Sequence, residues 1–175
     1  MNTETAAEKI IFDFRTAARQ DGWQIVNDDV MGGASTSRFQ VLNSGGAIFS
    51  GQVSLENNGG FASVRSLPAS HDLSGCDAFL LQVCGDDRRY KFTVRTEPRF
   101  DAPLYQCIFG TKRGEWEEPR LAFDDFVPTF RGSVLAGVPP INPAKVCSVG
   151  LLIADQQAGA FLLEIRWIKA TRRRS

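Results

Sequence analysis

Apolar and polar side chains alternate with a period of two along most of the chain, whereas helical periodicity hardly appears. In residues 89–97, Tyr90, Phe92 and Val94 fall on one face of an extended backbone and polar residues fall on the other. Successive side chains of a strand point to opposite faces, so this pattern predicts a strand with one face in the core. Similar patterns predict strands at 9–14, 47–55, 61–67, 77–85, 104–111, 116–123, 146–155 and 161–170.

The predicted strands follow one another through short turns, without the amphipathic helical segments that a βαβ fold needs. We therefore expect an all-β protein, an antiparallel two-sheet β-sandwich of the jelly-roll type with about ten strands and little helix. The 13 phenylalanines suit the interdigitated inner faces of two sheets. Short helical turns are expected around 15–20 and 124–126, and the Pro- and Gly-rich segment 127–143 is expected to be irregular.

The length of 175 residues, without internal repeat or linker, predicts one domain. Its expected bounds are 9–170, with a flexible N-terminus at 1–8 and a basic C-terminal tail at 171–175. No apolar run approaches the roughly 20 residues that cross a bilayer. The N-terminus resembles neither a secretory signal nor an organelle transit peptide. We expect a cytoplasmic protein, and a monomer.

Twenty basic residues balance twenty acidic ones, so the composition does not indicate a nucleic-acid partner. The tail KATRRRS is the one dense basic run, and it suits either a solvated C-terminus or a weak attraction to phosphates or to an anionic membrane surface. The four cysteines lack C-x-x-C spacing and the chain has one histidine, so a zinc site is not indicated. We expect the cysteines to be reduced, mostly buried, small hydrophobic residues.

Two stretches share an order of acid or amide followed by Gly-Gly: NDDVMGG at 27–33 and ENNGG at 56–60. The adjacent acids of the first do not follow the alternating spacing of a calcium loop, because neighbouring side chains of an extended backbone point apart. A cation held jointly by both loops is one alternative. The favoured interpretation is turn construction, in which Asx side chains bond nearby backbone amides and glycines take positive φ. The expected turn glycines are Gly32, Gly33, Gly59 and Gly60, and no metal is expected.

The sequence does not indicate a catalytic set. His71 lies in a loop-like segment without a G-x-S-x-G nucleophile, and the scattered acids cannot be paired across a cleft from spacing alone. The glycine-rich stretches 32–37 and 132–137 do not match a phosphate-binding loop between a strand and a helix. We therefore assign no catalytic residue and no cofactor.

A binding surface is the more favoured prediction. Arg65 and Arg95 lie in the middle of predicted strands, each between apolar residues that should face the core. Each guanidinium then points to the other face, where a concave sheet presents it to carboxylates or sugar hydroxyls. Trp23, Tyr105 and Trp116 are candidates for stacking on that surface or for the core. The candidate surface residues are Asn27, Asp28, Asn57, Asn58, Arg65, Arg95, Gln106 and Asp155.

Four segments together resemble a known family: WQIVNDDVMGGAS (23–35), FSGQVSLENNGGFASVR (49–65), DDFVPTFRG (124–132) and SVGLLIADQQAGAFLLEIRWI (148–168). In this order they are similar to the thirty-kilodalton complex I intermediate-associated protein family, over residues 10 to 170 or so. The positions within its motifs, with unspecified roles, are Asn27, Asp28, Met31, Gly32, Gly33, Asn57, Asn58, Gly59, Gly60, Phe61 and Arg65.

The resemblance implies a galactose-binding-like jelly roll. It also implies a role in assembly, because mitochondrial members act as assembly factors for respiratory complex I without known catalysis. Related domains occur in bacteria and photosynthetic lineages, sometimes attached to nucleotide-binding domains. This chain shows neither a transit peptide nor such a domain, which favours a stand-alone bacterial protein. No catalytic residue carries over.

These observations predict a non-enzymatic protein-binding module, an assembly factor or chaperone-like protein for a membrane redox or photosynthetic complex. Its expected partners are protein subunits or assembly intermediates of that complex. The alternative is a carbohydrate- or small-ligand-binding module of the galactose-binding-like class, although a shared fold is weak support for a shared function. A third hypothesis is a hydrolase or reductase that uses Asp28 or Asp155.

Overall fold

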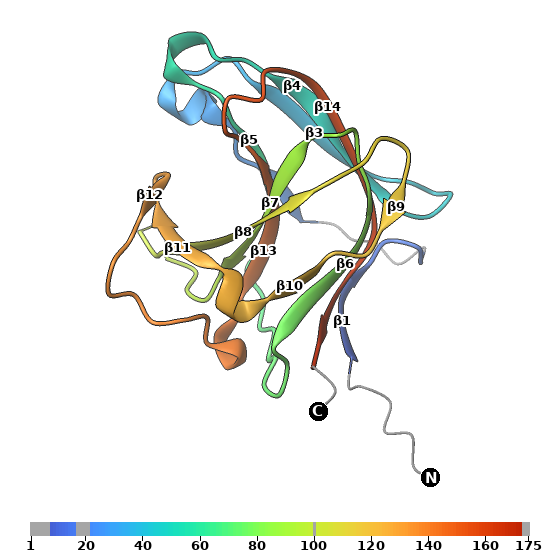
Figure 1. Cartoon of the computed structure of the whole chain (residues 1–175), viewed down its shortest axis with the longest axis vertical. Coiled ribbons are helices and arrows are strands. Elements are labelled where there is room, and N and C mark those ends of the chain that lie inside the picture. Colours follow the sequence, from blue (N-terminus) through green and yellow to red (C-terminus); the bar gives the residue numbers. More distant parts are fainter. Residues whose placement is uncertain (1–7, 17–21, 100, 173–175) are drawn as a thin grey trace.

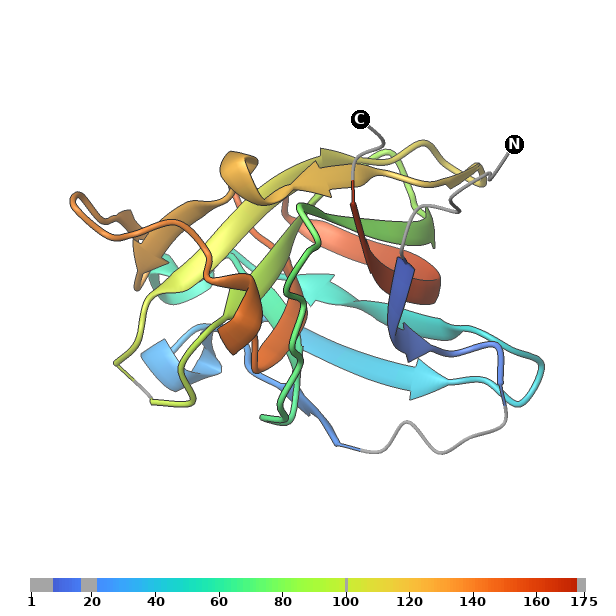
Figure 2. The same ribbon diagram turned by 90° about the horizontal axis from the view of Figure 1, so that it is seen from below.

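The computed structural model describes residues 8–16, 22–99 and 101–172, and it contains two antiparallel β-sheets (Figure 1). Seen from below, β1 and β14 lie to the right and the β11–β12 hairpin lies to the left (Figure 2). The first sheet has the order β10 (Arg120–Ala122), β6 (Ala78–Cys84), β14 (Gly159–Thr171), β4 (Ala47–Val53) and β3 (Thr36–Val41), with β1 (Glu8–Asp13) beside β14 and β9 (Trp116–Glu117) beside β6. The second sheet has the order β12 (Ser133–Val134), β11 (Val127–Phe130), β8 (Leu104–Gly110), β7 (Arg89–Arg95), β13 (Ser148–Ile153), β5 (Ala62–Ser66) and β2 (Trp23–Ile25).

Strand β14 organises the first sheet. Its first half pairs with β4, from Gly159 opposite Val53 onward, and its second half pairs with β1. A register shift between Ile165 and Trp167 separates the two halves in the pairing with β6. The long strand therefore joins the start of the described chain to its end, because Glu8 stands opposite Thr171.

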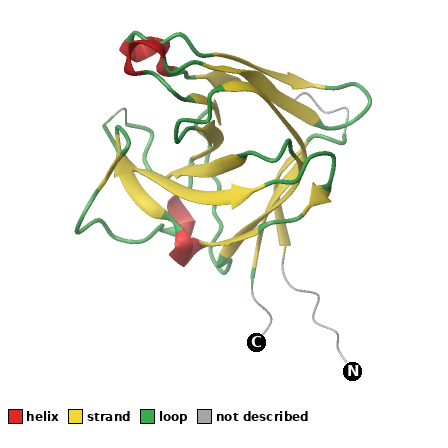
Figure 3. Ribbon diagram, turned by 45° about the horizontal axis from the view of Figure 1, so that its top comes forward, coloured by secondary structure: helices red, strands yellow, loops and turns green. Residues whose placement is uncertain are grey.

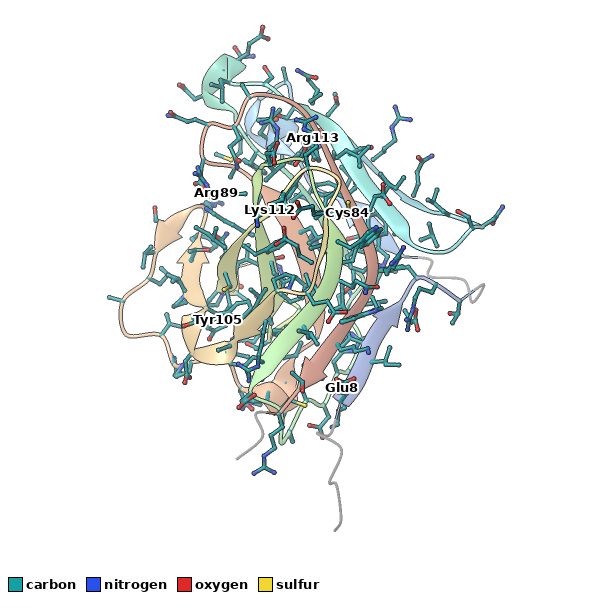
Figure 4. The ribbon with its side chains drawn as sticks, turned by 45° about the vertical axis from the view of Figure 1, so that its right-hand side comes forward. Glu8, Cys84, Arg89, Tyr105, Lys112 and Arg113 are labelled. Carbon is teal, nitrogen blue, oxygen red and sulfur yellow. The ribbon has the colours of Figure 1, made fainter. Side chains whose placement is uncertain are left out.

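The core lies between the sheets and is built from the alternation that the sequence shows (Figure 4, with Tyr105 on the second sheet and Glu8 at the start of β1). In the second sheet, Tyr90, Phe92 and Val94 of β7 are fully buried. In the first sheet, Phe79 of β6 is fully buried. Its ring packs against the rings of Phe92, Phe123 and Phe126, with centroid distances of 4.9 to 5.6 Å. Interdigitated aromatic rings thus connect the two sheets.

The structure confirms the predicted all-β sandwich, and its described residues form fourteen strands rather than about ten. The additional strands are short or lie at sheet edges. The prediction missed β2 and β3. It took 116–123 as one strand, whereas Pro119 lies between β9 and β10, and it took 127–143 as irregular although this segment contains β11 and β12. Within the described residues, helix occurs as four short 3₁₀ turns (Figure 3): η1 (Asp28–Met31), η2 (Glu56–Asn58), η3 (Phe123–Asp125) and η4 (Pro143–Lys145).

The turn expected at 124–126 corresponds to η3. The turn expected around 15–20, the flexible segment 1–8 and the basic tail 171–175 fall largely outside the described residues. Within the described ranges, no helix is both long and apolar enough to cross a membrane.

We expect Phe79→Ala to lower the free energy of unfolding by about 3–5 kcal/mol, because it removes a fully buried ring from the contact between the sheets. Ile108→Ala is the control, since this β8 side chain is 55% exposed and its loss should cost less than about 0.5 kcal/mol. Urea denaturation followed by tryptophan fluorescence measures both. Equal effects of the two substitutions would contradict this account of the core.

Candidate functional site

The carboxylate of Asp28 is fully buried and accepts hydrogen bonds from four donors. Ser35 donates its backbone N–H (2.9 Å) and its hydroxyl (2.6 Å). From a segment 32 and 33 residues away in the sequence, the backbone N–H groups of Gly60 (2.7 Å) and Phe61 (3.3 Å) donate to Asp28 Oδ2. We call this arrangement the Asp28 clamp. It joins NDDVMGG to ENNGG, so the two loops form one unit, and η1 and η2 lie side by side in Figure 1.

The clamp holds Asp28 in its ionised form. Burial raises the pKa of this carboxyl, but the hydrogen bonds from Ser35, Gly60 and Phe61 outweigh burial and lower the pKa below its usual value. Hydrogen bonds to the charged form of a carboxylate have this effect, because protonation would remove an acceptor. The negative charge is thus stabilised by four neutral hydrogen-bond donors.

Asn27 extends the clamp to both sheets. Its Oδ1 accepts hydrogen bonds from the Ser37 hydroxyl on β3 (2.8 Å) and from the Ser63 backbone N–H on β5 (3.2 Å). The Ser35 hydroxyl also accepts a bond from the backbone N–H of Ser54, just after β4 (2.9 Å). Strands β3 and β4 belong to the first sheet and β5 belongs to the second, so this polar network ties the sheets together at one end.

The structure explains in two ways why glycine occupies the four Gly-Gly positions of the two loops. Gly32 and Gly60 take φ values of 85° and 131°, which side chains rarely adopt. Gly33 and Gly59 lie against the clamp: a Cβ on Gly33 would stand 2.4 Å from Asp28 Cγ, and one on Gly59 would stand 2.5 Å from Asp28 Oδ2. Positive φ was expected at all four, and the structure instead assigns two of them to space around a buried carboxylate.

The expectation that Asn27 and Asp28 are surface residues is corrected by their burial. Asn27 is 7% exposed and Asp28 is 0% exposed, because their side chains bond backbone groups of distant segments. Neither can contact a partner directly. Asn57 and Asn58 are exposed in η2 and adopt left-handed backbone conformations, with φ of 55° and 58°.

Three of the remaining candidates, Arg65, Arg95 and Gln106, lie on the outer face of the second sheet, the face that points away from the core. Cross-strand pairing aligns one row of residues over six strands of this face: Gln24, Arg65, Gly150, Thr93, Gln106 and Val127. Arg95 stands in the next row, opposite Ser148. Arg65 and Arg95 therefore flank β13 diagonally, with Gly150 contributing no side chain between them.

The two arginines line a hollow of about 150 Å³, which we call the arginine pocket. Ser148 also lines it and is only 3% exposed although it points outward. The other lining residues are Gln24, Ser66, Pro68, Pro98, Arg99 and Cys147. Asp155 lies elsewhere, at the turn after β13, where it pairs with Lys91 (3.1 Å).

The aromatic candidates do not join this face. Tyr105 points into the core and donates its hydroxyl to the Pro139 carbonyl (2.8 Å). Trp23 packs on Phe39, with centroids 4.7 Å apart. Trp116 lies on the first sheet, where its ring stacks against the Arg166 guanidinium at 3.8 Å.

The described residues offer poor nucleophiles. Burial raises the pKa of all four cysteine thiols, that of Cys107 to about 11, so little thiolate forms at neutral pH. Burial lowers the pKa of His71, whose Nε2 is buried without a hydrogen-bond partner. His71 is thus less solvated than its loop-like sequence suggested. No group of three or more His, Cys, Asp or Glu side chains in the described ranges is arranged to hold a metal ion.

Comparison with known proteins decides the family. Residues 12–165 match the family described as complex I intermediate-associated protein 30. The chain belongs to this family. The mouse mitochondrial complex I intermediate-associated protein 30 is 26% identical over 91% of this chain, and the Neurospora crassa protein of the same name is 26% identical over 92%. The chain spans 55% of the mouse protein's length, or about half of it.

Solved structures of other proteins resemble this chain in fold alone. The family 11 carbohydrate-binding module of a Clostridium thermocellum cellulase superposes with a TM-score of 0.70 at 13% identity, covering 97% of this chain and 96% of that module. An agarase, AgWH50C, contains a similar domain, with a TM-score of 0.65 at 12% identity and 25% of its chain covered. The jelly-roll expectation that followed from the family resemblance is confirmed.

We expect Asp28→Asn to lower the free energy of unfolding at pH 7 by about 2–4 kcal/mol, because an amide NH₂ then faces N–H donors that lose their acceptor. Asp29→Asn is the matched control. Asp29 is exposed and accepts one hydrogen bond, from the Val30 backbone, so its change should be below about 0.5 kcal/mol. Urea denaturation of both variants measures the difference.

The Asp28→Asn effect should depend on pH. The folded-state pKa of Asp28 is lowered, so its stabilisation is present above the unfolded pKa of about 3.9 and is lost as the pH falls through the folded value. The stability difference between wild type and variant should be constant above about pH 5 and shrink below about pH 4. Other carboxyls with lowered pKa, such as Asp13 and Asp72, titrate in both proteins and cancel. A difference that is flat throughout the acid range would contradict a charged clamp.

Proposed function

We propose that this family member is a non-enzymatic protein-binding module that assists the assembly of a membrane redox complex of the complex I type. The mouse and Neurospora relatives are named for association with complex I intermediates, which supports this proposal. Its partners are then protein subunits or assembly intermediates of such a complex. A location in the bacterial cytoplasm stays a prediction for this chain, whereas the names of both relatives place them in mitochondria.

The observation that carries the proposal is the outer face of the second sheet, where Arg65 and Arg95 are partly buried without a partner among the described residues. Gln106 belongs to the same face, and Asn57 and Asn58 lie in the loops that the Asp28 clamp holds together. Exposed apolar side chains accompany these polar ones: Ile108 is 55% exposed on β8, and Val30 is 70% exposed in η1. Mixed apolar and cationic surfaces suit protein partners.

A carbohydrate-binding role is the second candidate, favoured by the likeness to the Clostridium module. Sugar rings need a flat apolar surface, which an exposed aromatic ring provides. Among the described residues, Trp116 is the one aromatic side chain exposed as a large hydrophobic, and it lies on the first sheet against Arg166. The outer face of the second sheet therefore favours a protein partner over a sugar.

We expect affinity purification of the tagged chain from native membranes to recover subunits of a complex I-type assembly in incomplete particles, separated by native electrophoresis. A tagged Arg38→Gln variant, altered at an exposed cation on β3 of the other sheet, should recover the same subunits. Recovery of mature complex only, or of no subunit above the untagged control, would contradict the proposed function.

Titration calorimetry with a mixed-linked β-glucan tetrasaccharide separates the two candidates. We expect no heat of binding at millimolar sugar, because the outer face of the second sheet lacks an exposed aromatic platform among the described residues. A dissociation constant of about 1 mM or tighter would favour the carbohydrate-binding alternative.

A further inference from the structure

The arginine pocket contrasts with every other partly buried cation in the described part of the chain. Arg88 donates to the carbonyls of Gln157 and Ala158, and the remaining ones have a carboxylate or an aromatic ring. These pairs are Lys91 with Asp155, Lys169 with Glu8, and Arg166 with Trp116. Arg65 and Arg95 alone have no hydrogen-bond, ion-pair or ring partner among the described residues. The other half-buried cations of the described residues each have a hydrogen-bond, ion-pair or ring partner, so Arg65 and Arg95 are the two available to bind an external group.

The arginine pocket also contains an unsatisfied hydrogen-bond donor. Arg95 Nε is buried and has no hydrogen-bond acceptor among the described residues, and an unsatisfied buried donor is destabilising. Burial, and then the nearby charge of Arg65, lower the pKa of the Arg95 guanidinium. One anion between the two arginines would accept from Arg95 and reduce the repulsion between like charges.

The surroundings select the kind of anion. Arg99, at the edge of the pocket, is paired with Glu97 (2.8 Å) and Asp101 (3.4 Å), so two carboxylates stand beside the entrance. They disfavour a doubly charged phosphate or a polyanionic surface more than they disfavour a single negative charge. The net charge of zero likewise provides no long-range attraction to a polyanion. A planar, singly charged carboxylate matches the guanidinium fork.

Apolar side chains on the outer face of the second sheet indicate that the carboxylate belongs to a peptide. Leu67, which follows the pocket residue Ser66, is 46% exposed, and Ile108 of β8 is 55% exposed on the same face. We infer that the arginine pocket binds an aspartate or glutamate side chain of a partner protein, in a segment with apolar residues around the acid. This inference rests on the proposed function, whose partner would supply that segment.

Peptide binding tests the pocket by itself. The probes are acetyl-LAEAL-amide, its glutamine counterpart acetyl-LAQAL-amide, acetyl-LAQAL with a free C-terminal carboxylate, and inorganic phosphate. NMR titration follows the Nε–H resonance of Arg95. We expect the glutamate peptide to bind with a dissociation constant of about 1 mM and the glutamine amide to bind at least about tenfold more weakly. Tighter binding of the free-acid peptide would assign the pocket to a chain terminus and overturn the side-chain assignment.

Variants then assign the binding to the two arginines. Arg65→Gln and Arg95→Gln should each weaken binding of the glutamate peptide about tenfold, and Arg95→Lys should not rescue it because an ammonium lacks the planar fork. Arg38→Gln, the same charge change on the first sheet, should leave binding unchanged. The melting temperature of Arg65→Gln should stay the same or rise, since the substitution removes a like charge from Arg95.

Three further results would overturn the inference: equal binding of the glutamate and glutamine peptides to the wild type, tighter binding of phosphate, or unaltered binding in both arginine variants. The peptide comparison on the wild type stands even where a variant fails to fold. The proposed function is tested separately by purification of the tagged wild-type chain from membranes, and Arg65→Gln should then recover fewer subunits than the wild type. If the glutamate peptide binds selectively but no subunits are recovered from membranes, the pocket is retained and the assembly role is rejected. If subunits are recovered but the peptides bind equally, the pocket alone is rejected.

Discussion

One buried charge, the carboxylate of Asp28, constrains the region around the candidate site. An ionised carboxylate inside a protein is tolerated when several donors surround it, and here the donors come from residues 7, 32 and 33 positions away in the chain. Gly33 and Gly59 have no side chain because the same carboxylate occupies that space. The two Gly-Gly loops are therefore a single construction.

That construction gives the outer face of the second sheet its fixed boundary. Asn27 bonds to Ser63, which stands two residues before Arg65 on β5, so the clamp and the arginine pocket share a strand. The central strand β13 then brings Arg95 to the other side of Gly150. A rigid end and an open, cationic face together suit a module that binds proteins.

Much of the fold follows from local alternation, because an apolar side chain at every second position requires a strand with one buried face. Strand β3 escaped this reasoning, since its side chains are exposed or half-buried at a sheet edge. The faces of Arg65 and Arg95 were predictable from their apolar neighbours, but their meeting across β13 was not, because strand order depends on long-range pairing. The burial of Asp28 was equally hidden, since its donors are backbone groups of a distant loop.

The central claim is that the outer face of the second sheet contacts the assembly partner. Site-specific photo-crosslinking in cells tests it directly, with a benzophenone amino acid at Ile108 on that face or at Leu162 on the outer face of the first sheet. Both side chains are exposed, 55% and 42%, so access is comparable. The account predicts crosslinks to a complex subunit from position 108 and none from position 162. Crosslinks from position 162 with none from position 108 would contradict it.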